Sequence, residues 1–190
     1  MSKNIAIFAS GTGTNAKKII EFFQGRDDIQ VKLVVSNRRK APVLEMAASF
    51  GIETLLIRRA SFYDSEQTLE QLEERAIDFI VLAGFLWLIP PYLVDRFPKR
   101  MINIHPALLP KYGGKGMYGM YVHQAVAEAK EAETGITIHY VNAKYDEGDI
   151  IFQARCALEK TDSPETIAQK VRKLEHQHFA PIIERLLLKP

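Results

Sequence analysis

Ile5-Ala-Ile-Phe-Ala-Ser-Gly-Thr-Gly-Thr-Asn15 is the stretch that decides the fold of this chain. Its five apolar residues at 5–9 predict a buried strand, and the two glycines that follow predict a tight loop. Beyond the loop, Ile19, Ile20 and Phe23 have the spacing of one helical face. A strand, a glycine loop and a helix in this order form the first unit of an α/β sheet.

The same alternation continues as far as residue 100. Apolar runs at 31–35, 52–57 and 79–83 predict further strands, and residues 42–50 and 65–76 predict helices. Pro42 marks a helix start and Gly51 a helix stop. Continuous apolar strands indicate a parallel sheet with helices on both faces, and ligands gather at the carboxyl ends of such strands.

The pattern changes after residue 100. A glycine-rich loop at 113–122 precedes a helix at about 121–129, and strands at 134–141 and 150–158 are joined by a short polar connector that predicts an antiparallel hairpin. A long helix begins at Pro164, with its apolar stripe at Ile167, Val171, Leu174, Phe179, Ile182 and Leu186. The fold class is therefore α/β and Rossmann-like, with residues 1–190 expected to form one domain.

Composition excludes several classes of function. Lys plus Arg number 25 and Asp plus Glu 23, so the net charge of +2 predicts no nucleic-acid partner. We expect no signal peptide and no membrane partner, because no apolar run is long enough for either. Cys156 is the single cysteine, and its apolar neighbours favour a core thiol in a reducing, cytoplasmic setting. The sequence is compatible with a homodimer and does not decide the oligomeric state.

Met101-Ile-Asn-Ile-His-Pro-Ala-Leu-Leu-Pro110 carries the candidate catalytic groups. Asn103 and His105 alternate with two isoleucines, so on a strand the two polar side chains share one face. Pro106 stiffens the chain immediately after the histidine. Asp146, in the connector of the predicted hairpin, supplies a carboxylate that can polarise the imidazole.

Each signal also has a structural explanation. A lone histidine at a strand end is more often structural than catalytic. Gly11 and Gly13 suit a tight turn as well as a phosphate loop, and they match neither the dinucleotide motif nor the triphosphatase loop. Leu82-Ala-Gly-Phe-Leu-Trp-Leu-Ile-Pro90 reads as a core strand with its exit turn. The local patterns leave these alternatives open.

Taken together, the two motifs resemble the folate-dependent formyltransferases. Ser10-Gly-Thr-Gly-Thr-Asn15 and Asn103-Ile-His-Pro-Ala-Leu-Leu-Pro110, with the distal Asp146-Glu-Gly148, are similar to the branch that acts on glycinamide ribonucleotide. The resemblance covers nearly the whole chain. It implies transfer of the formyl group from 10-formyltetrahydrofolate, a co-substrate, to the amine of 5-phosphoribosylglycinamide in de novo purine biosynthesis, without a metal. It also implies a phosphate-binding half at about 1–100 and a catalytic and folate half at about 101–190.

The resemblance assigns roles to individual positions. The implied catalytic residues are Asn103, His105 and Asp146. The implied ligands of the ribonucleotide phosphate and ribose are Gly11, Thr12, Gly13, Thr14, Asn15 and Glu175. The implied folate contacts are Leu86, Trp87, Leu88, Ile89, Asn103, Val141 and Asn142. Three departures affect the folate side: Trp87 stands where some relatives have a basic residue, loop 113–122 is long, and residues 63–67 lack the arginine that many relatives carry.

Formyl transfer needs positioning and charge stabilisation rather than a covalent intermediate. Asn103 is expected to donate its amide N–H to the developing oxyanion. His105 is expected to act in its protonated form and to relay a proton to the leaving nitrogen. Asp146 is expected to raise the pKa of His105 and to organise a water molecule.

Other members of the same family share these motifs. Methionyl-tRNA formyltransferases add a C-terminal RNA-binding domain, and formyltetrahydrofolate deformylases place a regulatory domain before the catalytic one. The length of this chain favours neither of these two enzymes, because each carries an additional domain. The alternatives are a formyltransferase acting on another amine and a non-catalytic module that binds a phosphate ligand.

Overall fold

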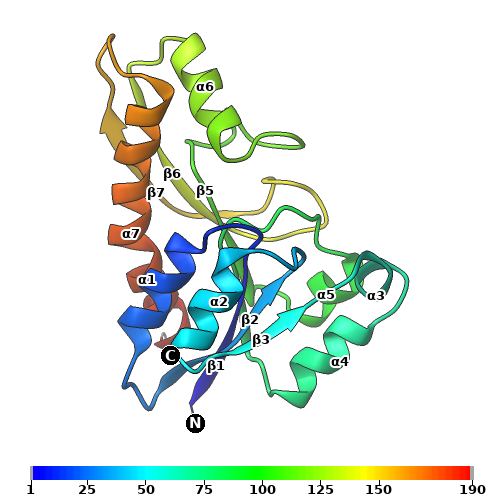
Figure 1. The fold of residues 1–190 in the computed structure, drawn as a ribbon. Helices are drawn as coiled ribbons and strands as arrows, with labels where there is room; N and C mark the ends of the chain where they lie inside the picture. The colour runs from blue at the N-terminus through cyan, green and yellow to red at the C-terminus, as the bar shows by residue number, and fades with distance from the viewer. Residues whose placement is uncertain (1, 189–190) are drawn as a thin grey trace.

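Seven strands form one sheet in the computed structural model of the chain, which describes residues 2–188 (Figure 1). Their order is β3-β2-β1-β4-β5-β6-β7; the first five run parallel, and β6 and β7 are antiparallel. The predicted sheet is confirmed. The bounds are β1 Lys3–Phe8, β2 Ile29–Ser36, β3 Glu53–Leu56, β4 Phe79–Leu82, β5 Met101–His105, β6 Glu133–Tyr140 and β7 Ile150–Ala157.

Helices cover both faces of this sheet, as predicted. Along β1, Ile5 and Ile7 belong to one buried cluster and Ala6 and Phe8 to the other, because successive side chains of a strand point to opposite faces. Helices α1, α2, α6 and α7 pack in the cluster that contains Ile5 and Ile7, which we call the first core cluster. Helices α3, α4 and α5 pack in the second core cluster, which contains Ala6 and Phe8. The bounds are α1 Thr14–Phe23, α2 Pro42–Ser49, α3 Arg59–Tyr63, α4 Gln67–Glu74, α5 Pro91–Arg96, α6 Met120–Glu128 and α7 Pro164–Leu188.

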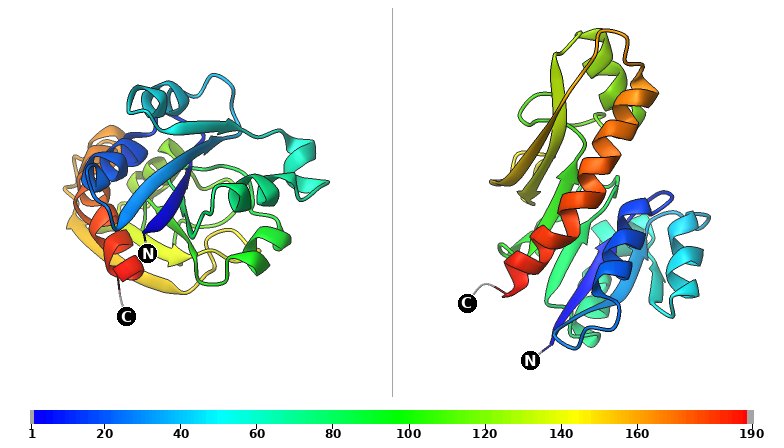
Figure 2. Two further views of the ribbon diagram at one scale, coloured as in Figure 1. Left: turned by 90° about the horizontal axis from the view of Figure 1, so that it is seen from below. Right: turned by 90° about the vertical axis from the view of Figure 1, so that its left-hand side faces the viewer.

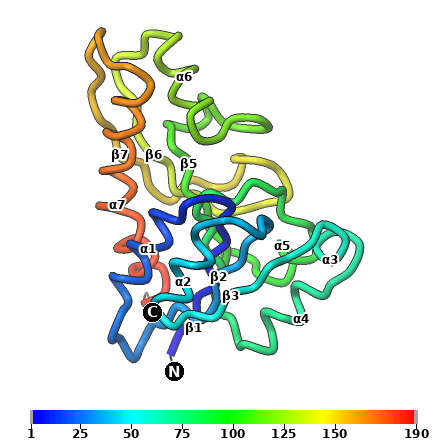
Figure 3. The backbone as a smooth tube through the Cα atoms, in the orientation of Figure 1, coloured from blue at the N-terminus to red at the C-terminus, as the bar shows by residue number. Residues whose placement is uncertain are grey.

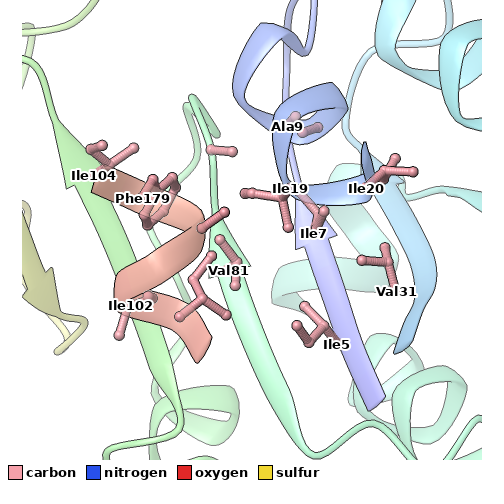
Figure 4. Packing of buried hydrophobic residues seen from close by; sticks show 14 of the residues in the cluster. Ile5, Ile7, Ala9, Ile19, Ile20, Val31, Val81, Ile102, Ile104 and Phe179 are labelled. Atoms are coloured by element: carbon pink, nitrogen blue, oxygen red, sulfur yellow. The ribbon is translucent and has the colours of Figure 1, made fainter. Parts of the chain in front are cut away.

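Packing in the first cluster explains why the opening stretch forms a βα unit. Ile19 and Ile20 of α1 lie against β1 and β2, where they meet Ile7 and Val31 (Figure 4). Phe179 of α7 lies against β5 in the same view. Burying each of these side chains stabilises the fold by roughly 1.5–3 kcal/mol before entropy is subtracted. The apolar run at 5–9 and the helical stripe after it are thus two sides of one interface.

Two short helices were not predicted. α3 has only five residues and α5 only six, too few to display a helical period in the sequence. The helix expected at 65–76 is the shorter α4, Gln67–Glu74. Its apolar side chain Leu72 is fully buried, as its spacing indicates.

The C-terminal hairpin and long helix follow the prediction. β6 pairs with both β5 and β7, and α7 runs along the hairpin and continues past α1 (Figure 2). Cys156 differs from the expected core thiol, because it lies on the edge strand β7 and is only partly buried. Burial still raises the pKa of its thiol above the ordinary value.

Three connecting segments meet near the middle of the molecule. The loop after β1, the glycine-rich loop before α6 and the β6–β7 connector lie between the β1–β3 region and α6 (Figure 3). Two of these segments carry six of the candidate site residues: Gly11, Thr12 and Gly13 after β1, and Val141, Asn142 and Asp146 in the connector. Within residues 2–188, no helix is both long and apolar enough to cross a membrane.

Candidate active site

A cavity of about 610 Å³ opens at the carboxyl ends of β1, β4 and β5. Carboxyl ends of parallel strands are the usual ligand position in open α/β sheets. The structure brings every predicted site residue to this one cavity. Its lining includes Gly11, Thr12, Gly13, Thr14, Asn15, Leu86, Trp87, Leu88, Ile89, Asn103, His105, Val141, Asn142, Asp146 and Glu175.

β5 presents Asn103 and His105 to the cavity. Ile102 and Ile104 point to the opposite face and are buried in the first core cluster, as the alternation predicts. In the antiparallel pairing with β6, Asn103 lies opposite His139. A second imidazole therefore enters the site from a neighbouring strand.

Asp146 is the centre of the polar group. Its Oδ1 accepts a hydrogen bond from Asn103 Nδ2 at 3.3 Å, and its Oδ2 accepts one from the Gly114 backbone N–H at 2.9 Å. His105 Nδ1 lies 3.5 Å from Oδ2, and His139 Nε2 lies 3.5 Å from Oδ1. One carboxylate thus contacts two histidines, an amide and a loop N–H.

The protonation states follow from this packing. Burial works to raise the pKa of Asp146, but His139, His105 and the Gly114 N–H outweigh it and hold the pKa below the ordinary value. For His105, burial is the largest influence and lowers the pKa; Asp146 and the Tyr112 carbonyl oppose it only in part. Asp146 therefore raises the pKa of His105 as expected, but burial outweighs it and lowers the net pKa, which favours the neutral imidazole over the expected protonated form.

Hydrogen bonds to the neighbouring strand change the expectation for Asn103 as well. Its Nδ2 donates to Asp146 and lies 3.1 Å from His139 Nε2. His139 Nδ1 lies 2.8 Å from the Tyr140 carbonyl, which can only accept, so Nδ1 carries a hydrogen. Asn103 is therefore held inside the protein by its contacts with Asp146 and His139.

The glycine loop lies at the N-terminus of α1. Gly13 is the N-cap residue with φ 75°, and a Cβ there would lie 2.3 Å from Val43 Cγ2. Ser10 is buried, donates to Asn37 and accepts from the Leu86 backbone N–H, so it holds the loop rather than a ligand. The unpaired N–H groups of the first helical turn face a ready anion site.

Asn15 and Glu175 meet although they are far apart in sequence. Asn15 Nδ2 donates to Glu175 Oε2 at 3.0 Å, which joins α1 to α7 beside the cavity. Burial raises the pKa of Glu175, and the Asn15 hydrogen bond opposes this only in part. Glu175 is thus a half-buried side chain that lines the cavity rather than an exposed helix residue.

The segment after β4 forms the apolar wall. Tyr63 donates its hydroxyl to the Leu88 carbonyl at 2.9 Å, which fixes the segment to α3. The Trp87 ring packs at 5.6 Å from Phe62 and 5.9 Å from Tyr63, between ring centroids. This wall is opposite in character to the polar group around Asp146, as a site for a flat, partly apolar ligand requires.

Three lining residues were missed from the sequence. His139 could have been found from the polar alternation in Thr137-Ile-His-Tyr140, whereas nothing local marks the others. Arg172 lies one helical turn before Glu175 and is exposed. His123 of α6 is buried, and burial and Arg172 lower its pKa to about 4. Its Nδ1 has no hydrogen-bond partner among residues 2–188.

Across residues 2–188, no three His, Cys, Asp or Glu side chains are grouped so as to hold a metal ion.

Known proteins resemble this chain over nearly its whole length. The chain is 41% identical over 187 residues to the chloroplastic phosphoribosylglycinamide formyltransferase of Arabidopsis thaliana, covering 95% of this chain and 64% of that protein. It is 34% identical to the Bacillus subtilis phosphoribosylglycinamide formyltransferase, covering 97% of this chain and 95% of that one. The chain therefore spans less than two thirds of the plant relative but nearly all of the bacterial one.

A solved structure has the same fold. Glycinamide ribonucleotide transformylase 1 from Geobacillus kaustophilus superposes with a TM-score of 0.88 at 32% identity, covering 98% of this chain and all of that chain. The sequence profile of the formyl transferases matches residues 3–183. This chain belongs to the formyl transferase family.

Proposed function

We propose that the protein transfers the formyl group of 10-formyltetrahydrofolate to the amine of 5-phosphoribosylglycinamide, as a step of purine biosynthesis. The observation that carries this proposal is the single cavity in which an anion-binding loop, an apolar wall and the Asn103–His105–Asp146 group meet. Each substrate has a chemically suited region there. The names of the bacterial and plant relatives support the same reaction.

The ribonucleotide phosphate is assigned to the N-terminus of α1. The backbone N–H groups of that turn attract an anion. Arg172 adds a positive charge on the same cavity. Glu175, held by Asn15, is the acceptor for the ribose hydroxyls.

The folate is assigned to the apolar wall and the start of the β6–β7 connector. Leu86, Trp87, Leu88 and Ile89 supply one side, and Val141 and Asn142 supply the other. The ring system of the co-substrate is flat and largely apolar, so this slot excludes water around it. The formyl carbon then lies toward Asn103 and His105.

The chemistry uses His105 as a neutral base. The substrate amine attacks the formyl carbon, and His105 Nδ1 accepts the proton that the amine loses. Asp146, at 3.5 Å, stabilises the imidazolium that forms. The same proton goes to the folate nitrogen as the tetrahedral intermediate collapses. Asn103 donates to the oxyanion once the substrate displaces one of its internal hydrogen bonds.

The test is a turnover assay with both substrates. Purified protein, 10-formyltetrahydrofolate and glycinamide ribonucleotide should yield formylglycinamide ribonucleotide and tetrahydrofolate in equal amounts, measured by mass spectrometry. Release of formate without the ribonucleotide would indicate a deformylase instead. Binding of both ligands without any product would indicate a non-catalytic module.

The remaining proposals concern the setting of the enzyme. We assign the reaction to the cytoplasm, with the two small molecules as partners and neither nucleic acid nor membrane involved. The phosphate-binding half is placed at about 1–100 and the catalytic and folate half at about 101–190. Sedimentation analysis at micromolar concentration tests the homodimer.

A further inference from the structure

The loop after β5 makes an unusual contact with His105. The Tyr112 carbonyl oxygen lies 2.6 Å from His105 Nε2. Because a carbonyl can only accept, Nε2 carries the hydrogen, and Nδ1 is left facing Asp146 and the cavity. The backbone of residue 112 therefore determines which imidazole nitrogen is available for proton transfer.

Tyr112 reaches this position in a conformation that a bulky residue rarely adopts. Its φ of 56° lies in the left-handed region, where a side chain is strained unless other contacts hold it. The following residues are also constrained. A Cβ on Gly113 would lie 2.5 Å from Leu109 Cδ2, and the Gly114 N–H is bonded to Asp146.

Glu131 supplies the contact that holds Tyr112. The Tyr112 hydroxyl donates to Glu131 Oε1 at 2.8 Å, and the ring packs against the first core cluster. Burial and the Glu131 carboxylate raise the pKa of Tyr112 to about 12, so the hydroxyl stays a donor at working pH. Lys111 Nζ contacts the same oxygen at 2.8 Å, but its side chain is 68% exposed. Neither Tyr112 nor Glu131 lines the cavity.

We propose that Tyr112 and Glu131 are positioning residues for His105: their hydrogen bond holds the Tyr112 carbonyl in place and thereby keeps the hydrogen of the imidazole on Nε2. This inference deepens the proposed function and rests on it for its kinetic consequences. The other groups that act on His105 are Asp146 and His139. Asp146 faces Nδ1 and favours a hydrogen there, so a hydrogen on Nε2 depends on the Tyr112 carbonyl. His123 of α6 also lies close enough for the charge of His105 to lower the pKa of His123.

The test compares three single variants. Tyr112→Phe removes the hydroxyl and keeps the ring, and kcat should fall about 10-fold with both KM values unchanged, the expected scale for losing one partly buried hydrogen bond. Glu131→Gln keeps an acceptor oxygen and should retain most of kcat. Lys111→Ala, the matched control, leaves the Tyr112–Glu131 bond intact and should behave as wild type.

Nitrogen-15 NMR of the His105 ring gives a readout independent of turnover. In wild type the hydrogen should be on Nε2, and in Tyr112→Phe a measurable fraction should move to Nδ1. Glu131→Ala should produce the same shift, and the double variant Tyr112→Phe/Glu131→Ala should lose no more than either single variant. Glu131→Ala keeps the inference testable if Tyr112→Phe does not fold.

Two results would overturn the inference. One is an unchanged tautomer in folded Tyr112→Phe, and the other is a loss that appears in KM rather than in kcat. If wild type gave no formylated product while the tautomer still moved in the variants, the proposed function would fail and the positioning role would stand.

Discussion

At the scale of single residues, the site depends on one carboxylate with several partners. Asp146 accepts from Asn103 and Gly114 and lies 3.5 Å from the nearest nitrogens of His105 and His139. A buried carboxylate needs such partners, because an unpaired buried charge costs several kcal/mol. The same arrangement makes proton transfer at His105 possible, since a charge that forms on the imidazole is neutralised nearby.

Replacing His105 by Ala should lower kcat ~10²–10⁴-fold, because it removes the group that carries the proton from the amine to the folate nitrogen. Binding of the ribonucleotide phosphate should be little changed, since the phosphate loop lies on α1. Steady-state kinetics and ligand titration measure the two effects separately. Near-normal turnover at saturating substrates would contradict the assignment of His105 as the base.

Asp146→Asn should lower kcat sharply and shift the titration of His105 to lower pH. Asp146 raises the pKa of His105 against the larger effect of burial, so the pKa should fall further when the charge is removed. NMR titration of the His105 ring measures the midpoint in each protein. A loss of activity with equal midpoints would mean that Asp146 acts through a bound water instead.

At the scale of elements, the first βα unit combines a phosphate loop with tight packing. Gly13 caps α1 in a left-handed conformation and lies directly against Val43 of α2. Both constraints exclude a side chain, so the glycine spacing that the sequence shows has a structural cause as well as a functional one. Substitutions at Gly13 therefore cannot test phosphate binding by themselves.

Gly13→Ala should destabilise the fold by about 1–3 kcal/mol more than Gly25→Ala, because only Gly13 meets another residue. Gly25 has a similar φ of 76° and open space around its Cα, so it is a matched control for backbone strain. Urea unfolding of both variants measures the difference. Equal midpoints would show that Val43 yields to the added methyl group.

At the scale of the whole molecule, the sheet order joins distant parts of the chain in one cavity. β5 sits between the parallel β4 and the antiparallel β6, so residues from the loop after β1 to α7 line the same space. The cavity is also lined by His105 and His123, and burial lowers the pKa of both imidazoles. Stability of the whole fold must therefore depend on pH.

Acid should weaken the fold through His123. The pKa of His123 is about 4 in the folded state, against an ordinary value of 6.5. The neutral imidazole therefore contributes its full share to the free energy of unfolding above pH 6.5, and this share is lost as the pH falls toward 4. Between pH 7 and pH 5 the free energy of unfolding should fall by about 2 kcal/mol through this group. His123→Leu should lose correspondingly less stability over that interval in urea unfolding. Parallel pH profiles for the two proteins would exclude His123 as the cause.

Some elements and site residues could be predicted from the sequence, and others could not. Apolar periodicity predicted β1, the parallel units and the hairpin, and the spacing of Asn103 and His105 placed both on one strand face. Periodicity did not reveal α3 or α5, because a helix of five or six residues is shorter than the pattern needed to detect it. His139 was missed because its role depends on the register between β5 and β6.

The sequence by itself determined the order of strands and helices, the polar face of Asn103 and His105, and the loop that caps α1. The tertiary structure alone decided that Asn15 meets Glu175, that Asp146 lies between two histidines, and that burial lowers the pKa of His105. The reason is physical. Periodicity and turn chemistry act between neighbours in the chain, whereas a pKa or a tautomer depends on burial and on partners that only the folded chain brings within a few ångströms.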